Sequence, residues 1–171
     1  YAHDHATQLA VVRYGNVMGS RGSVVPFFQA KIQAEEPLPI TDQRMTRFWI
    51  TLHQAVKFEV DSLDQMSGGE LYVPRIPSMK IVDLVDALAP GYPIVEIGIR
   101  PGEKLHEEMI SSDDSYRTVK QDDRFVVMPT IAEWGFEPVE GAPVSPGFSY
   151  RSDTNDRWLS PSELRTILDL D

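Results

Sequence analysis

The chain has 171 residues, contains no cysteine and carries a formal net charge of −10 at pH 7. Disulfides, thiolate zinc sites and thiol nucleophiles are therefore excluded in this sequence, and the lack of cysteine favours a cytoplasmic protein. The acidic balance argues against general nucleic-acid binding, which depends on many Lys and Arg contacts to phosphates. No apolar run approaches the roughly 18 residues of a membrane helix, so no membrane contact is expected.

The first third of the chain predicts a strand, a glycine loop and a helix. Leu9 to Tyr14 is a short run rich in Val, typical of a strand that is buried on both faces. Ser23 is the expected N-cap of a helix over residues 24–34, and residues 38–41 are predicted as a strand or an extended loop. Residues 1–8 supply no partner for the first strand, so we expect a truncated chain.

The middle of the chain continues the alternation. Thr51 and Gln54 have the spacing of a capping box, which predicts a helix that ends at Gly68-Gly69. A strand is predicted over residues 70–74, and Ser78 is the expected cap of a helix that ends near residue 88. The first of these helices has apolar residues at helical spacing, namely Leu52, Val56, Val60 and Leu63.

The last third of the chain has a looser pattern. Residues 94–99 and 125–128 read as strands, and Ser160 and Glu163 form a second capping box, with Pro161 at the first helical position. Strands that alternate with helices along a chain predict an α/β sheet. No internal repeat or low-complexity tract interrupts the pattern.

The glycine loop leaves three interpretations open. Its spacing is Gly-x-x-x-Gly-x-x-Gly, and Asp42 follows Gly22 by twenty residues, as the ribose-binding acid does in a dinucleotide fingerprint. The spacing departs from that fingerprint, however, and the loop carries Arg13 and Arg21, whereas the fingerprint relies mainly on backbone N–H groups. A dinucleotide fingerprint, a purely structural loop and another phosphate contact are the alternatives.

Two further segments place arginine beside residues that stiffen or turn the chain. They are residues 44–50, Arg-Met-Thr-Arg-Phe-Trp-Ile, and residues 99–104, Ile-Arg-Pro-Gly-Glu-Lys. A guanidinium has a planar fork of donors that matches phosphate oxygens, so arginines from both segments could clamp a diphosphate. Surface ion pairing with the abundant carboxylates is the alternative.

Several ordered motifs together resemble the inverting UDP-N-acetylglucosamine 4,6-dehydratases. These are extended short-chain dehydrogenase/reductases of pseudaminic-acid and related surface-glycan biosynthesis. The resemblance covers nearly the whole chain but only the C-terminal half of the family. The motifs are Val12–Val17, Gly19–Phe28, Pro39–Asp42, Arg44–Ile50, Pro77–Lys80, Arg100–Glu107, Ser152–Asn155 and Trp158–Ser160.

The resemblance implies a fold and a division of the chain. The fold would be α/β, the C-terminal part of an extended short-chain dehydrogenase/reductase, with the end of a Rossmann-type sheet and a smaller α/β substrate-binding domain. Residues 1–23 would be the last strand and loop of the dinucleotide-binding domain. Residues 24–171 would be the sugar-nucleotide part, with some elements packing back on the Rossmann sheet.

The resemblance also implies an activity for the whole protein. The family uses NADP and a Tyr-x-x-x-Lys pair to oxidise sugar C4, remove water across C5 and C6, and return hydride to C6 with inversion at C5. Tyr1 is followed four residues later by His5, so the pair is absent, and neither a catalytic residue nor a metal ligand is assigned here. The chain alone is expected to be inactive. A UDP-sugar 4- or 2-epimerase and a non-catalytic sugar-nucleotide-binding module are the alternatives, and homo-oligomerisation of the full enzyme stays open.

Matched position by position, the resemblance implies contacts to the diphosphate and ribose of UDP-N-acetylglucosamine. Arg47 and Arg100 would clamp the diphosphate, and the Asn16 amide would donate to it. Glu103 would bind a ribose hydroxyl. Arg21 would contact a phosphate or the sugar, or form an ion pair at the helix end.

The remaining implied contacts concern uridine and the cofactor. Val24, through its backbone, and Pro39 and Thr41, through shape and hydrogen bonding, would form the uridine slot. Tyr14 and Gly15 would lie by the nicotinamide end of NADP, which the other half of the protein would hold. The glycine loop would thus approach a UDP-sugar diphosphate.

Overall fold

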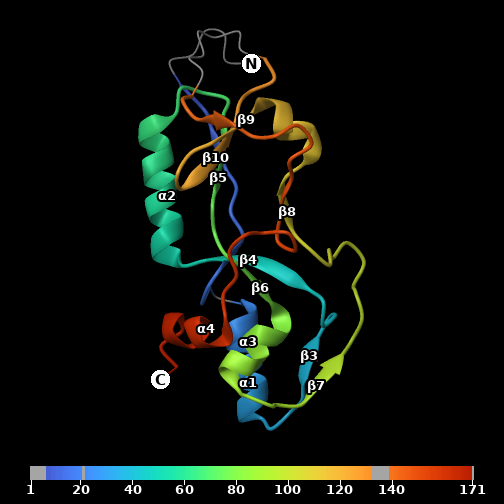
Figure 1. Cartoon of the computed structure of the whole chain (residues 1–171). Coiled ribbons are helices and arrows are strands. Elements are labelled where there is room, and N and C mark those ends of the chain that lie inside the picture. Colours follow the sequence, from blue (N-terminus) through green and yellow to red (C-terminus); the bar gives the residue numbers. More distant parts are fainter. Residues whose placement is uncertain (1–6, 21, 132–138, 171) are drawn as a thin grey trace. The chain divides into compact units, whose positions relative to one another are not determined.

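The computed structural model describes residues 7–20, 22–131 and 139–170 (Figure 1). Its helices, with both parallel and antiparallel strand pairs, confirm the predicted α/β class. The chain divides into two compact units, and the boundary after residue 23 that the resemblance implies stays a prediction. In described residues, unit 1 comprises 7–14, 53–75, 108–131 and 139–150, and unit 2 comprises 15–20, 22–52, 76–107 and 151–170.

Unit 1 contains a five-stranded sheet in the order β1-β5-β10-β9-β11. β1 pairs in parallel with β5, and the other neighbours are antiparallel. β1 is an edge strand in which Val11 is 58% exposed, and Leu9 just before it is 72% exposed. The prediction of a strand buried on both faces was therefore wrong. The strands are β1 (Val11–Val12), β5 (Leu71–Pro74), β9 (Thr118–Lys120), β10 (Arg124–Val127) and β11 (Ala142–Pro143).

Helix α2 (Leu52–Gln65) lies alongside β5 and β10 in unit 1 (Figure 1). Phe58 of this helix packs against Tyr72 and Val126 in the core of the unit. The predicted helix is confirmed, but its apolar stripe is exposed, because the buried positions are Ala55, Phe58 and Ser62. The stripe residues Leu52, Val56, Val60 and Leu63 are 50–65% exposed.

One arginine lies inside unit 1. Arg124 is 3% exposed, and its Nε and Nη2 each donate to a different carboxylate oxygen of Asp123 at 2.9 Å. Nη1 donates to Ser62 Oγ at 3.3 Å, and the guanidinium carbon is 4.8 Å from the centre of the Phe58 ring. The hydrogen bonds between Arg124 and Asp123 raise the pKa of the arginine and lower the pKa of the carboxyl. Each group thus stabilises the charged form of the other.

Unit 1 also contains β8 (Glu108–Ile110) and the 3-10 helix η1 (Ser112–Arg117). The chain passes from unit 1 into unit 2 within the short strand β12 (Tyr150–Arg151).

Unit 2 contains two small sheets. One has the order β2-β4-β6, in which β2 (Asn16–Val17) is parallel and β6 (Ser78–Lys80) is antiparallel to β4 (Thr46–Ile50). The other is the parallel pair of β3 (Leu38–Ile40) and β7 (Ile94–Glu96). β4 was not predicted from the sequence, although it is the central strand of its sheet.

The prediction that Ser78 caps a helix was wrong. Ser78 lies in β6, and helix α3 begins at Ile81. The Ser78 N–H donates to the carbonyl of Arg157 at 2.9 Å, and the Ser78 carbonyl accepts from Leu159 N at 2.8 Å. These backbone bonds hold Ser78 in an extended conformation, so the helix starts later than the local signal suggests.

Three helices of unit 2 surround its apolar core. They are α1 (Val24–Gln33), α3 (Ile81–Leu88) and α4 (Pro161–Ile167), and Figure 1 shows them beside one another. The capping box of α4 is confirmed, because Glu163 N donates to Ser160 Oγ and Ser160 N donates to Glu163 Oε2. The most deeply buried core side chains are Phe28, Leu38, Ile40, Met79, Leu84 and Leu164, each at most 1% exposed.

Candidate functional site

A pocket of about 490 Å³ lies within unit 2, among the start of α1 and strands β2, β3 and β4. The turn over residues 100–103 completes its wall. Seven of the eight substrate contacts implied by the resemblance line this pocket, and the eighth, Arg21, lies outside the described residues. The seven are Asn16, Val24, Pro39, Thr41, Arg47, Arg100 and Glu103.

Strand β4 brings two large side chains to the pocket. Side chains alternate between the two faces of a strand, so Arg47 and Trp49 share one face and Phe48 lies on the other. Both Arg47 and Trp49 line the pocket. Asn16 of β2 is the register partner of Trp49, which places the Asn16 amide at the same wall.

The approach of β2 to β4 requires glycine at residue 15. A Cβ atom on Gly15 would lie 2.5 Å from both the Cβ and the carbonyl oxygen of Phe48. Contacts that short do not occur, so any other residue would force the two segments apart. The need for glycine at this position is explained by packing against Phe48.

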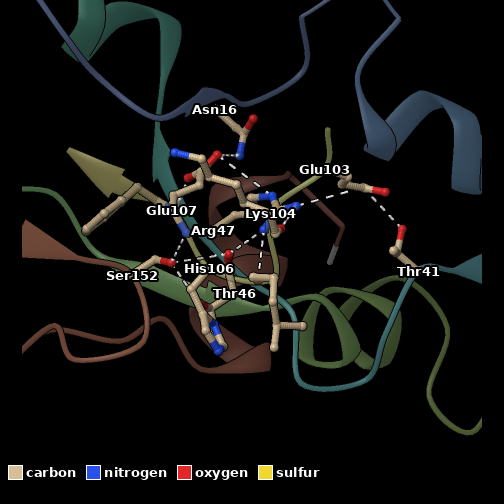
Figure 2. Close-up of polar contacts among 11 residues, drawn as sticks. Asn16, Thr41, Thr46, Arg47, Glu103, Lys104, His106, Glu107 and Ser152 are labelled. Atoms are coloured by element: carbon tan, nitrogen blue, oxygen red, sulfur yellow. Dashed lines mark hydrogen bonds and ion pairs between the residues drawn. The ribbon is translucent and has the colours of Figure 1, made fainter. Parts of the chain in front are cut away.

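The guanidinium of Arg47 is held mainly by backbone carbonyls. Nη1 donates to the carbonyls of Thr46 at 2.7 Å and Leu105 at 3.1 Å, and Nη2 donates to the carbonyl of Lys104 at 2.9 Å. Figure 2 shows Arg47 between two carboxylates: Glu103 Oε1 is 3.8 Å from Nη2, and Glu107 Oε1 is 3.8 Å from Nε. Of the five N–H groups of this guanidinium, two form no hydrogen bond within the described part of the chain. The side chain is therefore anchored, and these two N–H groups are on Nε and Nη2, the atoms nearest the two carboxylates.

Glu107 connects Arg47 and Asn16 to the backbone of β4. Its Oε2 accepts from Phe48 N at 2.8 Å, and its Oε1 accepts from Asn16 Nδ2 at 3.3 Å (Figure 2). Burial raises the pKa of Glu107, although the bond from Phe48 N and the nearby Arg47 charge work in the opposite direction. Glu107 ends the Arg100–Glu107 motif of the resemblance, which implied no role for it.

The turn at residues 100–103 presents Arg100 and Glu103 to the pocket. Glu103 N donates to the Arg100 carbonyl at 3.0 Å, and Gly102 has φ of +83°, a value that favours glycine. Pro followed by Gly at the centre of such a turn is typical of type II. Glu103 Oε1 accepts from Thr41 Oγ1 at 3.2 Å, which joins the turn to the end of β3.

Thr46, His106 and Ser152 form a polar cluster next to Arg47 that the sequence did not predict. Thr46 Oγ1 lies 2.8 Å from His106 Nδ1 and 2.7 Å from Ser152 Oγ (Figure 2). Ser152 Oγ also accepts from Glu107 N at 2.8 Å. The cluster therefore fixes the segment that carries Glu107 against β4. Ser152 stood in a quoted motif, but no local pattern pairs it with Thr46, 106 residues away.

Two buried polar atoms belong to residues that line the pocket. Trp49 Nε1 and Ser23 Oγ have no hydrogen-bond partner in the described ranges 7–20, 22–131 and 139–170. Ser23 occupies the predicted N-cap position of α1, but its side chain makes no capping bond. An unpaired buried polar atom costs free energy, so both atoms mark places in the pocket wall where hydrogen bonding is not fully satisfied.

Tyr14 and Gly15, the two implied cofactor contacts, do not line the pocket. Tyr14 belongs to unit 1, where its hydroxyl donates to Glu59 Oε1 at 2.6 Å, and this bond raises the pKa of Tyr14. Gly15 packs against Phe48, as described above. The structure thus accounts for both residues through contacts inside the chain, and their role toward NADP stays a prediction.

Asp42, the acid of the dinucleotide-fingerprint interpretation, faces an arginine. It is 7% exposed and accepts from Arg44 N at 2.8 Å, Nε at 3.0 Å and Nη2 at 2.7 Å. The hydrogen bonds from the Arg44 side chain are the main reason that the pKa of Asp42 falls to about 2. Its carboxylate is already occupied, which disfavours a ribose contact at this position.

The described residues contain neither a metal centre nor a membrane-spanning helix. In the described portion of the chain, no group of three or more His, Cys, Asp or Glu side chains is arranged to hold a metal ion. Among the helices of that portion, none is both long enough and apolar enough to cross a membrane.

Comparisons with known proteins support the resemblance. A UDP-N-acetylglucosamine 4,6-dehydratase (inverting) of Campylobacter jejuni is 49% identical in an alignment 176 residues long. The alignment covers 98% of this chain and 53% of that enzyme. A UDP-glucose 4-epimerase of Rickettsia canadensis is 39% identical over 112 residues, which cover 63% of this chain and 33% of that enzyme. The chain spans about half the length of the curated dehydratases it matches.

A solved structure and a family profile agree with this result. The X-ray structure of Pen from Bacillus thuringiensis superposes with a TM-score of 0.81 at 31% identity, covering 96% of this chain and 49% of that one. This likeness supports the C-terminal part of an extended short-chain dehydrogenase/reductase as the fold. The profile described as polysaccharide biosynthesis protein matches residues 1–129, so the chain belongs to the polysaccharide biosynthesis protein family.

Proposed function

We propose that the pocket of unit 2 binds the UDP part of UDP-N-acetylglucosamine, and that the chain is the substrate-binding half of an inverting UDP-N-acetylglucosamine 4,6-dehydratase. The observation that carries this proposal is the convergence of seven implied contacts on one pocket. They come from β2, α1, β3, β4 and the turn at residues 100–103, which are up to 87 positions apart in the sequence (16 to 103).

The chemistry of the wall suits a nucleoside diphosphate. Arg47 and Arg100 supply positive charge, and the start of α1 at Val24 adds the positive end of a ten-residue helix. The planar guanidinium of Arg47 matches phosphate oxygens, and its ion pairs with Glu103 and Glu107 are both 3.8 Å long. On the other side of the pocket, Thr41 and Glu103 offer hydroxyl and carboxylate groups that suit ribose hydroxyls, and Pro39 adds an apolar surface for the base.

A dehydratase is favoured over an epimerase by the comparisons. The matched dehydratase is more similar than the epimerase and matches nearly the whole of this chain. The proposal includes NADP, bound mainly by the part of the protein outside this chain, with Tyr14 and Gly15 near its nicotinamide. NADP would take up and return the hydride. We also propose a cytoplasmic enzyme in surface-glycan biosynthesis, of the pseudaminic-acid type or a related one.

The binding half of the proposal is tested by titrating UDP and UMP into the protein by calorimetry. We expect UDP to bind more tightly than UMP, because only UDP carries the second phosphate that the arginines would clamp. Arg47→Ala should weaken UDP binding. The matched control is Arg157→Ala, which removes an exposed arginine outside the pocket and should leave UDP binding unchanged. Failure of the wild-type protein to bind UDP would contradict the proposal.

The catalytic half is tested with the longer protein that carries this chain. It should convert UDP-N-acetylglucosamine to a 4-keto-6-deoxy sugar with inverted C5, which NMR of the product can establish. A product that keeps its C6 hydroxyl and differs only at C4 or C2 would instead support an epimerase. The chain by itself should give no product, and UDP binding without turnover by the longer protein would support a non-catalytic binding module.

A further inference from the structure

We infer that Glu107 is a positioning residue that sets the hydrogen-bonding direction of the Asn16 amide in the pocket wall. The inference rests on the proposed function, because it takes the pocket to be a diphosphate site. Glu107 itself is not among the residues that line the pocket. It would therefore act on a ligand through Asn16, to which it is hydrogen-bonded.

The two oxygens of the Glu107 carboxylate have separate partners. Oε2 is committed to the β4 backbone by the 2.8 Å bond from Phe48 N. Oε1 faces two donors, Asn16 Nδ2 at 3.3 Å and Arg47 Nε at 3.8 Å (Figure 2). The backbone of Glu107 is also fixed, since its N–H donates to Ser152 Oγ. The carboxylate is thus held in one orientation relative to β4.

This arrangement determines which end of the Asn16 amide faces Glu107. An ionised carboxylate only accepts hydrogen bonds, so it selects the NH₂ group of a neighbouring amide rather than its carbonyl oxygen. One N–H of Asn16 is then used by Glu107, and the second is left to donate to an anion. The reversed amide would keep its NH₂ group away from Glu107 and present a different face to the phosphate.

Electrostatics alone predicts the opposite effect for Glu107. The charged groups that act on it are Arg47 and Lys104, and Arg47 also lies 3.8 Å from Glu103. A carboxylate at this wall repels a diphosphate, so its removal should strengthen UDP binding if charge were its only contribution. A positioning role predicts weaker binding, and the sign of the change separates the two.

The isosteric change Glu107→Gln is the sharpest test. Phe48 N requires an acceptor, so the new amide must place its oxygen there and turn its NH₂ group toward Asn16 and Arg47. Donor would then face donor, and the Asn16 amide should reverse. We expect UDP to bind about tenfold more weakly, the usual scale for one charge-assisted hydrogen bond. In an Asn16→Ala background the same change should cost less than threefold, because its target is gone.

The matched control is Asp83→Asn. Asp83 is another half-buried carboxyl of unit 2 whose pKa is raised by burial, and it lies on α3 away from the pocket lining. This variant should bind UDP as the wild type does. The ligand-free readout is the ¹⁵N–¹H signal pair of the Asn16 side chain, which should shift in Glu107→Gln and stay in place in Asp83→Asn.

The outcomes separate the inference from the function on which it rests. If the wild type does not bind UDP, the proposed function fails and the inference fails with it. If the wild type binds UDP and folded Glu107→Gln binds it equally or more tightly, only the inference is overturned. A full tenfold loss in the Asn16→Ala background would also overturn it. Should Glu107→Gln not fold, Glu107→Asp takes its place: a carboxylate one methylene shorter should weaken UDP binding at least twofold, and unchanged affinity would contradict the inference.

Discussion

Units 1 and 2 each hold an arginine that is followed by phenylalanine in a strand, and the two arginines are held in different ways. Arg124 of β10 has both ends of its guanidinium fork on the Asp123 carboxylate at 2.9 Å. Arg47 of β4 donates to three carbonyl oxygens, and its two nearest carboxylates are 3.8 Å away. Arg124 thus forms a bidentate pair with one carboxylate, whereas Arg47 is oriented by neutral carbonyls and has only longer ion pairs, with Glu103 and Glu107.

The two arginines show which contacts separate an arginine that is paired within the fold from one that we propose to bind a ligand. Burial does not decide it alone, because the Arg47 side chain is itself only 15% exposed. What separates the two arginines is the kind of hydrogen-bond acceptor that each guanidinium contacts. Neutral carbonyls fix the direction of a guanidinium and leave its charge for a ligand, while a bidentate carboxylate uses both the geometry and the charge.

The largest effect is expected from removing the structural arginine. Arg124→Met should lower the free energy of unfolding by about 3 kcal/mol, because it leaves the buried Ser62 hydroxyl without a donor and removes the contacts of the guanidinium with Asp123 and the Phe58 ring. Denaturant unfolding measures this loss. UDP affinity of the folded variant should equal that of the wild type. A loss of stability below about 1 kcal/mol would mean that Arg124 is not the anchor that its contacts indicate.

For Arg47, which we propose binds the diphosphate, the main effect should be on UDP affinity rather than on stability. Arg47→Ala should weaken UDP binding by about 1.5 to 3 kcal/mol, or roughly ten- to over a hundredfold. Arg47→Lys should recover part of the affinity, since a lysine supplies the charge without the planar fork. Calorimetry with UDP checks both variants. If Arg47→Lys matched the wild type, the fork geometry would be irrelevant and only the charge would matter.

A smaller effect is expected for Arg100. This residue is exposed at the pocket rim, so solvent screens its charge more than that of Arg47. Arg100→Ala should weaken UDP binding by about 1 kcal/mol, roughly fivefold, and raising the salt concentration should reduce the difference from the wild type. A salt-independent loss as large as that of Arg47→Ala would show that Arg100 is buried by the ligand.

The smallest effect concerns Asp42, which pairs with an arginine whose side chain is 73% exposed. The pKa of Asp42 is about 2 in the folded protein, against an ordinary value of 3.8. A carboxyl with a lowered pKa stabilises the fold above its unfolded pKa and loses that contribution as the pH falls. The wild type should therefore lose stability between about pH 4 and pH 2 more steeply than Asp42→Asn. Equal slopes in acid-dependent unfolding would contradict the pairing with Arg44.

Residues of the pocket wall could be named from the sequence, whereas the strand that carries one of them, Arg47, could not. The resemblance indicated the residues of the wall, and seven of them share one pocket. β4 escaped prediction because four of its five residues are buried, so the alternation of polar and apolar residues that marks a half-exposed strand is missing. Arg47 was thus identified as a candidate site residue, but the strand in which it lies was not predicted.

Other misses have the same physical origin in long-range contacts. The bond from Phe48 N to Glu107 joins residues 59 positions apart, and no local pattern predicts it. The cap signal at Ser78 was overridden by backbone bonds to residues 157 and 159. On α2, the apolar spacing was correct, but the face that packs on the sheet is the one with Ala55, Phe58 and Ser62.

The close approach of Gly15 to Phe48 has a consequence for mutational scans of this protein. Because Gly15 precedes Asn16 directly, any side chain at position 15 would displace the amide from the pocket wall as it pushes β2 from β4. A library screened for ligand binding would therefore rank position 15 among the most sensitive. A reader of that library would assign Gly15 a ligand contact, although its intolerance would arise from a clash on the opposite side, with the backbone and Cβ of Phe48.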